Sequence, residues 1–118
     1  MQWIHCLSYF FGGAFFANAI PHYVSGLMGR AFQSPFAKPP GKGLSSSIAN
    51  MLWGAFNIAV GYLLIFRVGL FDLRSTLEVL AAGIGALVMS VFAARTFGRF
   101  HGGNIQTAPD SPEKTAKL

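Results

Sequence analysis

The segment from Ile48 to Phe66 reads IANMLWGAFNIAVGYLLIF and contains no Lys, Arg, Asp or Glu. A helix needs about 20 apolar residues to cross a hydrocarbon layer roughly 30 Å thick, and this segment has that length. Two other segments are similar, because residues 1–29 carry no charged side chain and residues 77–94 carry only Glu78. The sequence therefore predicts an all-α integral membrane protein.

The composition supports the same class of protein. The chain has 118 residues, of which 53% are hydrophobic and 11% charged, and its mean hydropathy is +0.47. A soluble domain carries roughly 25% charged residues. The net charge of +5 comes from cations beside the apolar segments, where they set topology and meet anionic lipid head groups. We therefore expect a lipid bilayer with anionic head groups as a partner, and no nucleic acid.

We expect one transmembrane domain, residues 1–100, with three spans at residues 3–21, 48–69 and 76–97. Pro21 lacks a backbone N–H and disfavours helical geometry in the residue before it, so the first span is predicted to end there. Residues 22–47 then form an interfacial loop that begins with a short interfacial helix. The sequence leaves open whether residues 22–33 continue the first helix instead. Residues 101–118 are polar and are expected to form a mobile tail.

Serine residues are placed to begin the second and third helices. Ser45, Ser46 and Ser47 are candidate N-caps for the second span. The sequence Ser75-Thr76-Leu77-Glu78 fits a capping box, in which Ser75 caps the helix and Glu78 returns a hydrogen bond. The third helix is expected to end near Gly98.

Four polar residues lie within or beside the spans, and each pair shares a helix face. Asn18 and His22 are four residues apart, whereas Asn50 and Asn57 are seven apart. An unpaired amide in hydrocarbon costs several kcal/mol, so these side chains need partners. We interpret them as interhelical hydrogen-bonding residues, with Asn50 and Asn57 facing the first span near Asn18. The alternative is that they line a path for a solute or ion.

The third span carries small residues at every fourth position. This predicted packing face consists of Ala82, Ala86, Ser90 and Ala94. Small side chains allow two helix backbones to approach closely. We expect this face to contact the chain's own helices, other subunits or a second copy.

Cations on one side of the spans predict the orientation. Arg30, Lys38 and Lys42 lie in the first loop and are the candidate lipid head-group contacts. Arg95 and Arg99 lie near the end of the third span, on the same side. Because cytoplasmic loops are enriched in Lys and Arg, the first loop and the C-terminus are expected in the cytoplasm.

Residues 21–54 read PHYVSGLMGRAFQSPFAKPPGKGLSSSIANMLWG. The stretch combines Pro-His, Gly-x-x-Gly, Pro-Phe, Pro-Gly, Ser-Ser and Asn-x-x-Trp-Gly. This pattern resembles that of a family of small bacterial integral membrane proteins of uncharacterised activity. The resemblance covers less than a third of the chain, and it implies a bacterial membrane location. Together with the predicted spans, it leads us to expect a multi-pass protein of the bacterial inner (plasma) membrane.

The sequence lacks the usual catalytic motifs. It has no Walker loop, HExxH, GxSxG or paired carboxylates, and the single Cys6 cannot form an intrachain disulfide. We therefore expect no enzyme activity, no catalytic residues, no cofactor and no metal site. The main hypothesis is a non-enzymatic membrane protein that acts by helix–helix association, as a subunit or accessory of a larger assembly. The alternative is a small oligomeric channel or transporter for an ion or small solute. The sequence names neither the partner, the solute nor the oligomeric state.

Overall fold

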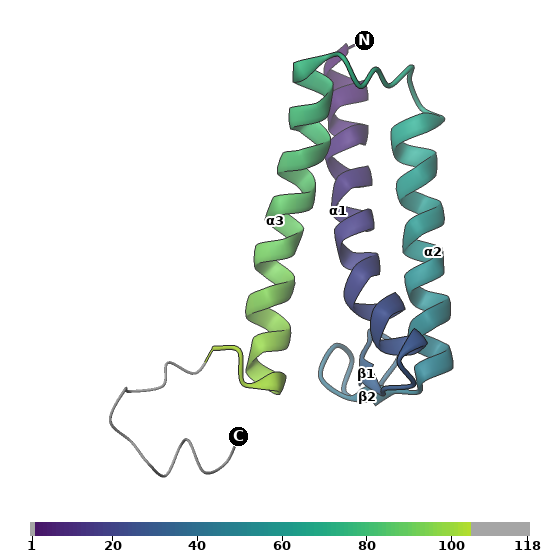
Figure 1. The fold of residues 1–118 in the computed structure, drawn as a ribbon, viewed down its shortest axis with the longest axis vertical. Coiled ribbons are helices and arrows are strands. Elements are labelled where there is room, and N and C mark those ends of the chain that lie inside the picture. Colours follow the sequence, from purple (N-terminus) through teal and green to yellow (C-terminus); the bar gives the residue numbers. More distant parts are fainter. Residues whose placement is uncertain (1, 105–118) are drawn as a thin grey trace.

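The computed structural model describes residues 2–104 and is mostly helical, so the all-α class is confirmed (Figure 1). Its elements are α1 (Gln2–Leu27), β1 (Phe32–Gln33), β2 (Leu44–Ser45), α2 (Ser47–Phe66) and α3 (Thr76–His101). The three helices run alternately up and down. The C-terminal end of α1, the hairpin, the start of α2 and the end of α3 therefore share one end of the bundle.

Helix α1 is the centre of the fold. It packs against both α2 and α3, whereas α2 and α3 make no substantial contact with each other (Figure 1). Its buried residues are correspondingly small or polar, and include Gly12, Gly13, Ala14 and Ala19. The outer helices instead expose large apolar side chains over most of their length. The core of this protein is thus two helix–helix interfaces that share one helix.

The predicted end of the first helix at residue 21 is wrong, because α1 continues through Pro21 to Leu27. The proline has no N–H to donate to the preceding turn, which weakens the helix locally. Packing of the next turns on α2 compensates for that loss. Gly26 lies so close to α2 that an added Cβ would sit 2.5 Å from the backbone nitrogen of Met51. Figure 1 shows α1 bending toward α2 in these last turns, as expected of a proline kink.

The expected interfacial loop contains an ordered hairpin. β1 and β2 pair antiparallel, with Phe32 opposite Ser45 and Gln33 opposite Leu44. The hydroxyl groups of Ser34 and Ser45 are 2.5 Å apart and tie the two strands further. Sequence reasoning missed these strands because two residues are too few to show an alternating pattern.

The N-cap of α2 is confirmed at Ser46, whose hydroxyl accepts a hydrogen bond from the Ala49 N–H at 3.1 Å. The helix ends at Phe66, three residues before the expected limit of 69. The cap residue Arg67 leaves helical geometry, with φ −121° and ψ −8°, while its N–H still donates to the Leu63 carbonyl.

The N-cap of α3 is confirmed at Ser75, whose hydroxyl accepts from the Glu78 N–H at 3.3 Å. The predicted return bond from Glu78 is wrong. The Ser75 N–H donates instead to the Asp72 carbonyl at 3.0 Å. The turn before the helix supplies this partner, because the Asp72 carboxylate also accepts from the Arg74 N–H at 2.9 Å.

Helix α3 extends past the predicted end near residue 97 and closes at His101. Gly98 is helical, and the left-handed residue that ends the helix is Gly102, with φ 80°. This placement follows from glycine's access to positive φ at the C-terminal cap. The expected tail of residues 101–118 therefore begins inside the helix, and residues 105–118 lie outside the described part of the chain.

Two helices, α2 and α3, are long and apolar enough to cross a membrane. At 1.5 Å per residue, the 20 residues of α2 extend about 30 Å. Helix α1 has 26 residues and no charged side chain, and it includes glycine, asparagine and histidine residues. That composition suits a central helix, which is covered by protein on two sides.

Candidate functional site

Asn50, in the first turn of α2, is fully buried and connects four segments of the chain. Its amide nitrogen lies 3.0 Å from the Phe32 carbonyl, 3.2 Å from that of Ser45 and 3.1 Å from that of Ser46. Its amide oxygen lies 2.9 Å from Nδ1 of His22 on α1. One side chain thereby joins α1, both strands of the hairpin and the start of α2.

These contacts assign the tautomer of His22. The amide nitrogen of Asn50 must face the three carbonyl oxygens, because only the nitrogen can donate to them. The amide oxygen therefore faces the imidazole, and Nδ1 of His22 must carry the hydrogen that it accepts. In the neutral ring, Nε2 is then left with a lone pair.

Aromatic rings enclose His22, which is 2% exposed. The rings of Phe32 and Phe97 meet the imidazole edge-on at centroid distances of 5.5 and 5.6 Å, and Trp53 does so at 6.4 Å. The prediction that residue 22 belongs to an interfacial loop is therefore wrong. His22 lies inside α1, at the meeting point of the hairpin and all three helices.

A second amide pair joins α1 and α2 two turns further along. Asn18 donates from its amide nitrogen to the amide oxygen of Asn57 at 3.0 Å. The nitrogen of Asn57 donates to the Trp53 carbonyl in its own helix at 2.7 Å. Asn57 is 1% exposed, so both of its polar groups are buried and both have partners. The two polar faces predicted from the spacing of the residues meet each other in this interface.

Glycines bring the two helices close enough for these short side chains to bond. Gly54 lies between the two asparagines, and an added Cβ would sit 2.6 Å from the backbone nitrogen of Tyr23. Gly61 faces Gly12 in the same way, with its added Cβ 3.1 Å from the Gly12 carbonyl oxygen. Asparagine can bridge two helices only when their backbones approach closely, so this glycine stripe and the amide pairs form one interface.

Part of the small-residue face of α3 contacts α1. An added Cβ at Gly13 would collide with the Ala82 carbonyl and lie 3.1 Å from the Ala86 nitrogen. Ser90 and Ala94 are exposed, so within the chain only the Ala82 and Ala86 part of the predicted face contacts α1. Four residues advance about 400° around a helix, so the row drifts by about 40° per step and about 120° over its length.

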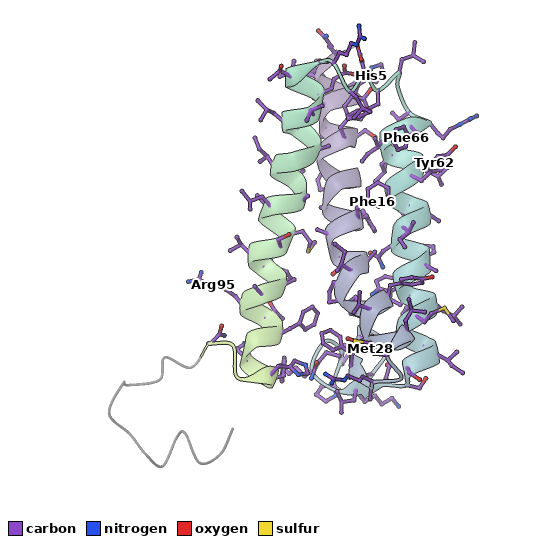
Figure 2. All side chains as sticks on the ribbon, viewed as in Figure 1. His5, Phe16, Met28, Tyr62, Phe66 and Arg95 are labelled. Carbon is purple, nitrogen blue, oxygen red and sulfur yellow. The ribbon has the colours of Figure 1, made fainter. Side chains whose placement is uncertain are left out.

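The predicted head-group residues Arg30, Lys38 and Lys42 are all exposed and lie at the hairpin end of the bundle. Arg95 and Arg99 belong to the last turns of α3 at the same end. Figure 2 shows Arg95 projecting from α3 away from the other helices, with Met28 near this end and His5 at the opposite end.

A groove runs along α1 between α2 and α3. Its larger compartment has a volume of about 550 Å³ and is mostly apolar, lined by phenylalanines of α1 and by Val88 and Met89 of α3. Its smaller compartment, about 360 Å³, lies beside the hairpin and is lined by His22, Gln33 and Ser34 among others. The groove therefore changes from apolar to polar toward the hairpin end.

Two residues of this region were missed by sequence reasoning. Gln33 is 4% exposed, and its amide oxygen lies 2.8 Å from Nε2 of His101. The His101 ring also stacks on Phe32, with centroids 5.1 Å apart and planes at 9°. No local pattern signals this contact, because 68 residues separate the two partners.

Within residues 2–104, no three His, Cys, Asp or Glu side chains gather in an arrangement that could hold a metal ion. Comparison with known protein families, with curated proteins and with solved structures gave no match to this chain. The interpretation of the site therefore depends on its geometry.

Proposed function

We propose that this chain is a three-span, non-enzymatic protein of the bacterial inner membrane that acts by helix–helix association, as a subunit or accessory of a larger membrane assembly. Two helices have the length and composition of a span. The uncharged α1 is enclosed between them, which supports its assignment as the third span.

The observation that carries the proposal is how the intramembrane polar side chains are used. His22 bonds to Asn50, and Asn18 bonds to Asn57, so all four are engaged in holding α1 to α2. Such bonds stabilise a bundle from within and leave its outer surface apolar. A protein with this arrangement offers its outward helix faces to other membrane components.

Helix α3 is the face we assign to association. Among the helices it packs substantially only on α1, its last turns also touch the hairpin, and little of its apolar length is buried within the chain. Its outward side includes Ser90 and Ala94, whose small side chains permit close approach of another helix. The Ser90 hydroxyl donates to the Ala86 carbonyl at 2.7 Å, so that surface exposes no unbonded polar group at this residue.

The alternative function, a small oligomeric channel or transporter, is favoured by one observation. Asn18 and Asn57 border the apolar compartment of the groove, and Asn18 and His22 border the polar one. These side chains could face a path if a second copy closed the open side of the groove. Their pairing within the chain supports a structural role instead.

Native gels of the protein extracted from bacterial membranes in a mild detergent test the main proposal. We expect a species heavier than one 12.7 kDa chain with its detergent. Ala94→Leu should reduce that species, because added bulk on an exposed contact face keeps the partner helix away. It should not change the thermal stability of the single chain, since Ala94 is exposed within it.

The matched control is Ala59→Leu, the same change at an exposed alanine on α2. The outward side of α2 carries large residues such as Leu52 and Phe56, so this control should keep the heavier species. A single-chain mass for the wild type would contradict the association proposal. Ion or solute flux in liposomes containing the protein would support the channel instead.

A further inference from the structure

The two compartments beside α1 form one continuous binding surface. Both are lined by Asn18, Trp53 and Phe92, so the two compartments adjoin at these residues. Their volumes, about 550 and 360 Å³, lie within the roughly 300–1,000 Å³ range of pockets that bind small molecules. The lining of the two compartments differs, and this difference points to an amphiphilic occupant.

The larger compartment is suited to a hydrocarbon chain. Phe10, Phe11 and Phe15 line it from α1, and Val88 and Met89 line it from α3. The only polar side chains there, besides the Trp53 indole, are Asn18 and Asn57, which are hydrogen-bonded to each other. An acyl chain would meet apolar surface along this length.

The smaller compartment is lined by two side chains that each have a polar atom without a hydrogen-bond partner within residues 2–104. His22 uses Nδ1 to bond Asn50, and no described group bonds its Nε2. Gln33 uses its amide oxygen to bond His101, and its amide nitrogen has no described partner. These side chains are 2% and 4% exposed.

These two atoms are available to bond a ligand that occupies the compartment. The tautomer assigned above makes Nε2 of His22 an acceptor, suited to a ligand hydroxyl. The Gln33 amide nitrogen is a donor, suited to phosphate or ester oxygens. The site therefore offers both kinds of group at the polar end of the groove.

The charge of the surrounding surface favours an anion. The hairpin end of the bundle carries five cations and no acidic residue within the described chain: Arg30, Lys38, Lys42, Arg95 and Arg99. The opposite end has two cations and two acidic residues, Arg67, Arg74, Asp72 and Glu78. The polar compartment lies at the cationic end, where an anionic head group is attracted.

We propose that this groove binds one anionic phospholipid, with an acyl chain in the larger compartment and its phosphate head in the smaller one. The inference depends on the proposed membrane insertion and is independent of the proposed assembly role. A neutral isoprenoid amphiphile would fill the apolar half but leave the cationic end without a counter-charge.

The test uses the full chain in vesicles of equimolar phosphatidylglycerol and phosphatidylcholine. The protein is extracted in mild detergent, and native mass spectrometry counts the lipids that remain bound. We expect one retained phosphatidylglycerol per chain. Val88→Trp should lower retention of either lipid by about tenfold, because the indole occupies space that the acyl chain needs.

Val91→Trp is the matched control, because Val88 and Val91 are both on α3 and are 54% and 53% exposed. Only Val88 lines the groove, so Val91→Trp should retain lipid as the wild type does. Gln33→Glu keeps the size of the side chain and an oxygen for His101, and it places a carboxylate beside the phosphate. It should abolish the preference for phosphatidylglycerol.

Equal retention of the two lipids by the wild type would overturn the proposal, as would equal loss in Val88→Trp and Val91→Trp. A bound mass of a neutral isoprenoid or a second chain in the groove would also overturn it. Failure of the protein to enter vesicles would overturn membrane insertion itself, which is a separate result.

Discussion

At the scale of single residues, Asn50 and Asn57 differ in how much structure depends on them. Asn50 bonds His22 and three backbone carbonyls that belong to the hairpin and the start of α2. Asn57 bonds one side chain of α1 and one carbonyl of its own helix. The seven-residue spacing indicated that both share a face. It could not indicate that one amide would join four segments.

We predict that Asn50→Leu destabilises the protein more than Asn57→Leu does. Losing the Asn18–Asn57 bond should cost about 0.6 kcal/mol, the average measured for interhelical bonds in membranes. Asn50→Leu removes the hydrogen-bond partner of the buried His22 Nδ1, at a cost of about 1–3 kcal/mol, and also removes the side-chain bonds to the hairpin carbonyls. Unfolding of the purified protein in mixed micelles, followed by circular dichroism, measures both free energies. Equal losses of unfolding free energy in the two variants would show that the contacts of Asn50 with the hairpin do not contribute to stability.

At the scale of elements, the sides of α3 differ in what they tolerate. Gly85 faces α1, and an added Cβ would collide with the Phe10 carbonyl. Gly83, two residues earlier, is exposed and has no neighbouring atom within 4 Å of an added Cβ. The side of α3 that carries Gly85 is thus the side on which the backbones of α3 and α1 approach each other closely.

We predict opposite effects for Gly85→Ala and Gly83→Ala. The first should destabilise by about 1–3 kcal/mol, the usual range for overpacking a tight interface. The second should stabilise by up to about 1 kcal/mol, because alanine is the better helix former. Thermal unfolding in detergent measures both changes against the wild type. If Gly85→Ala stabilised as much as Gly83→Ala, α3 would not pack on α1 through this face.

Helix boundaries were predicted correctly where side chains next to the boundary determine them. Ser46 and Ser75 are the N-caps of their helices, as their side chains predict. Pro21 was misinterpreted because its local cost is offset by contacts between α1 and α2, which are distant in sequence. The end of α3 was placed too early because Gly98 and Gly102 are equivalent by residue type, and only the backbone conformation distinguishes them.

At the scale of the whole molecule, the unequal charge of the two ends predicts the orientation. Five cations lie at the hairpin end, whereas two cations and two acidic residues lie at the other within the described chain. If the chain spans the membrane as we propose, the positive-inside rule predicts that the hairpin end faces the cytoplasm.

We predict that a cysteine at Lys42 resists a membrane-impermeant thiol reagent in intact cells, in a Cys6→Ser background. A cysteine at Leu73 should react, because it lies in the turn between α2 and α3 at the opposite end. A cysteine at Thr115, outside the described residues, is also expected to resist. Labelling after membrane disruption provides the control that each cysteine is reactive. External labelling of the Lys42 site would reverse the orientation.

The sequence by itself determined the helical class, the use of serines as N-caps of α2 and α3, and the faces on which the polar residues lie. Each depends on properties that repeat along the chain or act within one turn, such as apolar run length, serine caps and helical periodicity. The order of packing, with α1 between α2 and α3, was decided only in three dimensions. The bond between Gln33 and His101 and the groove beside α1 were also decided only in three dimensions. These features depend on which helices approach, and that depends on contacts between residues far apart in the chain.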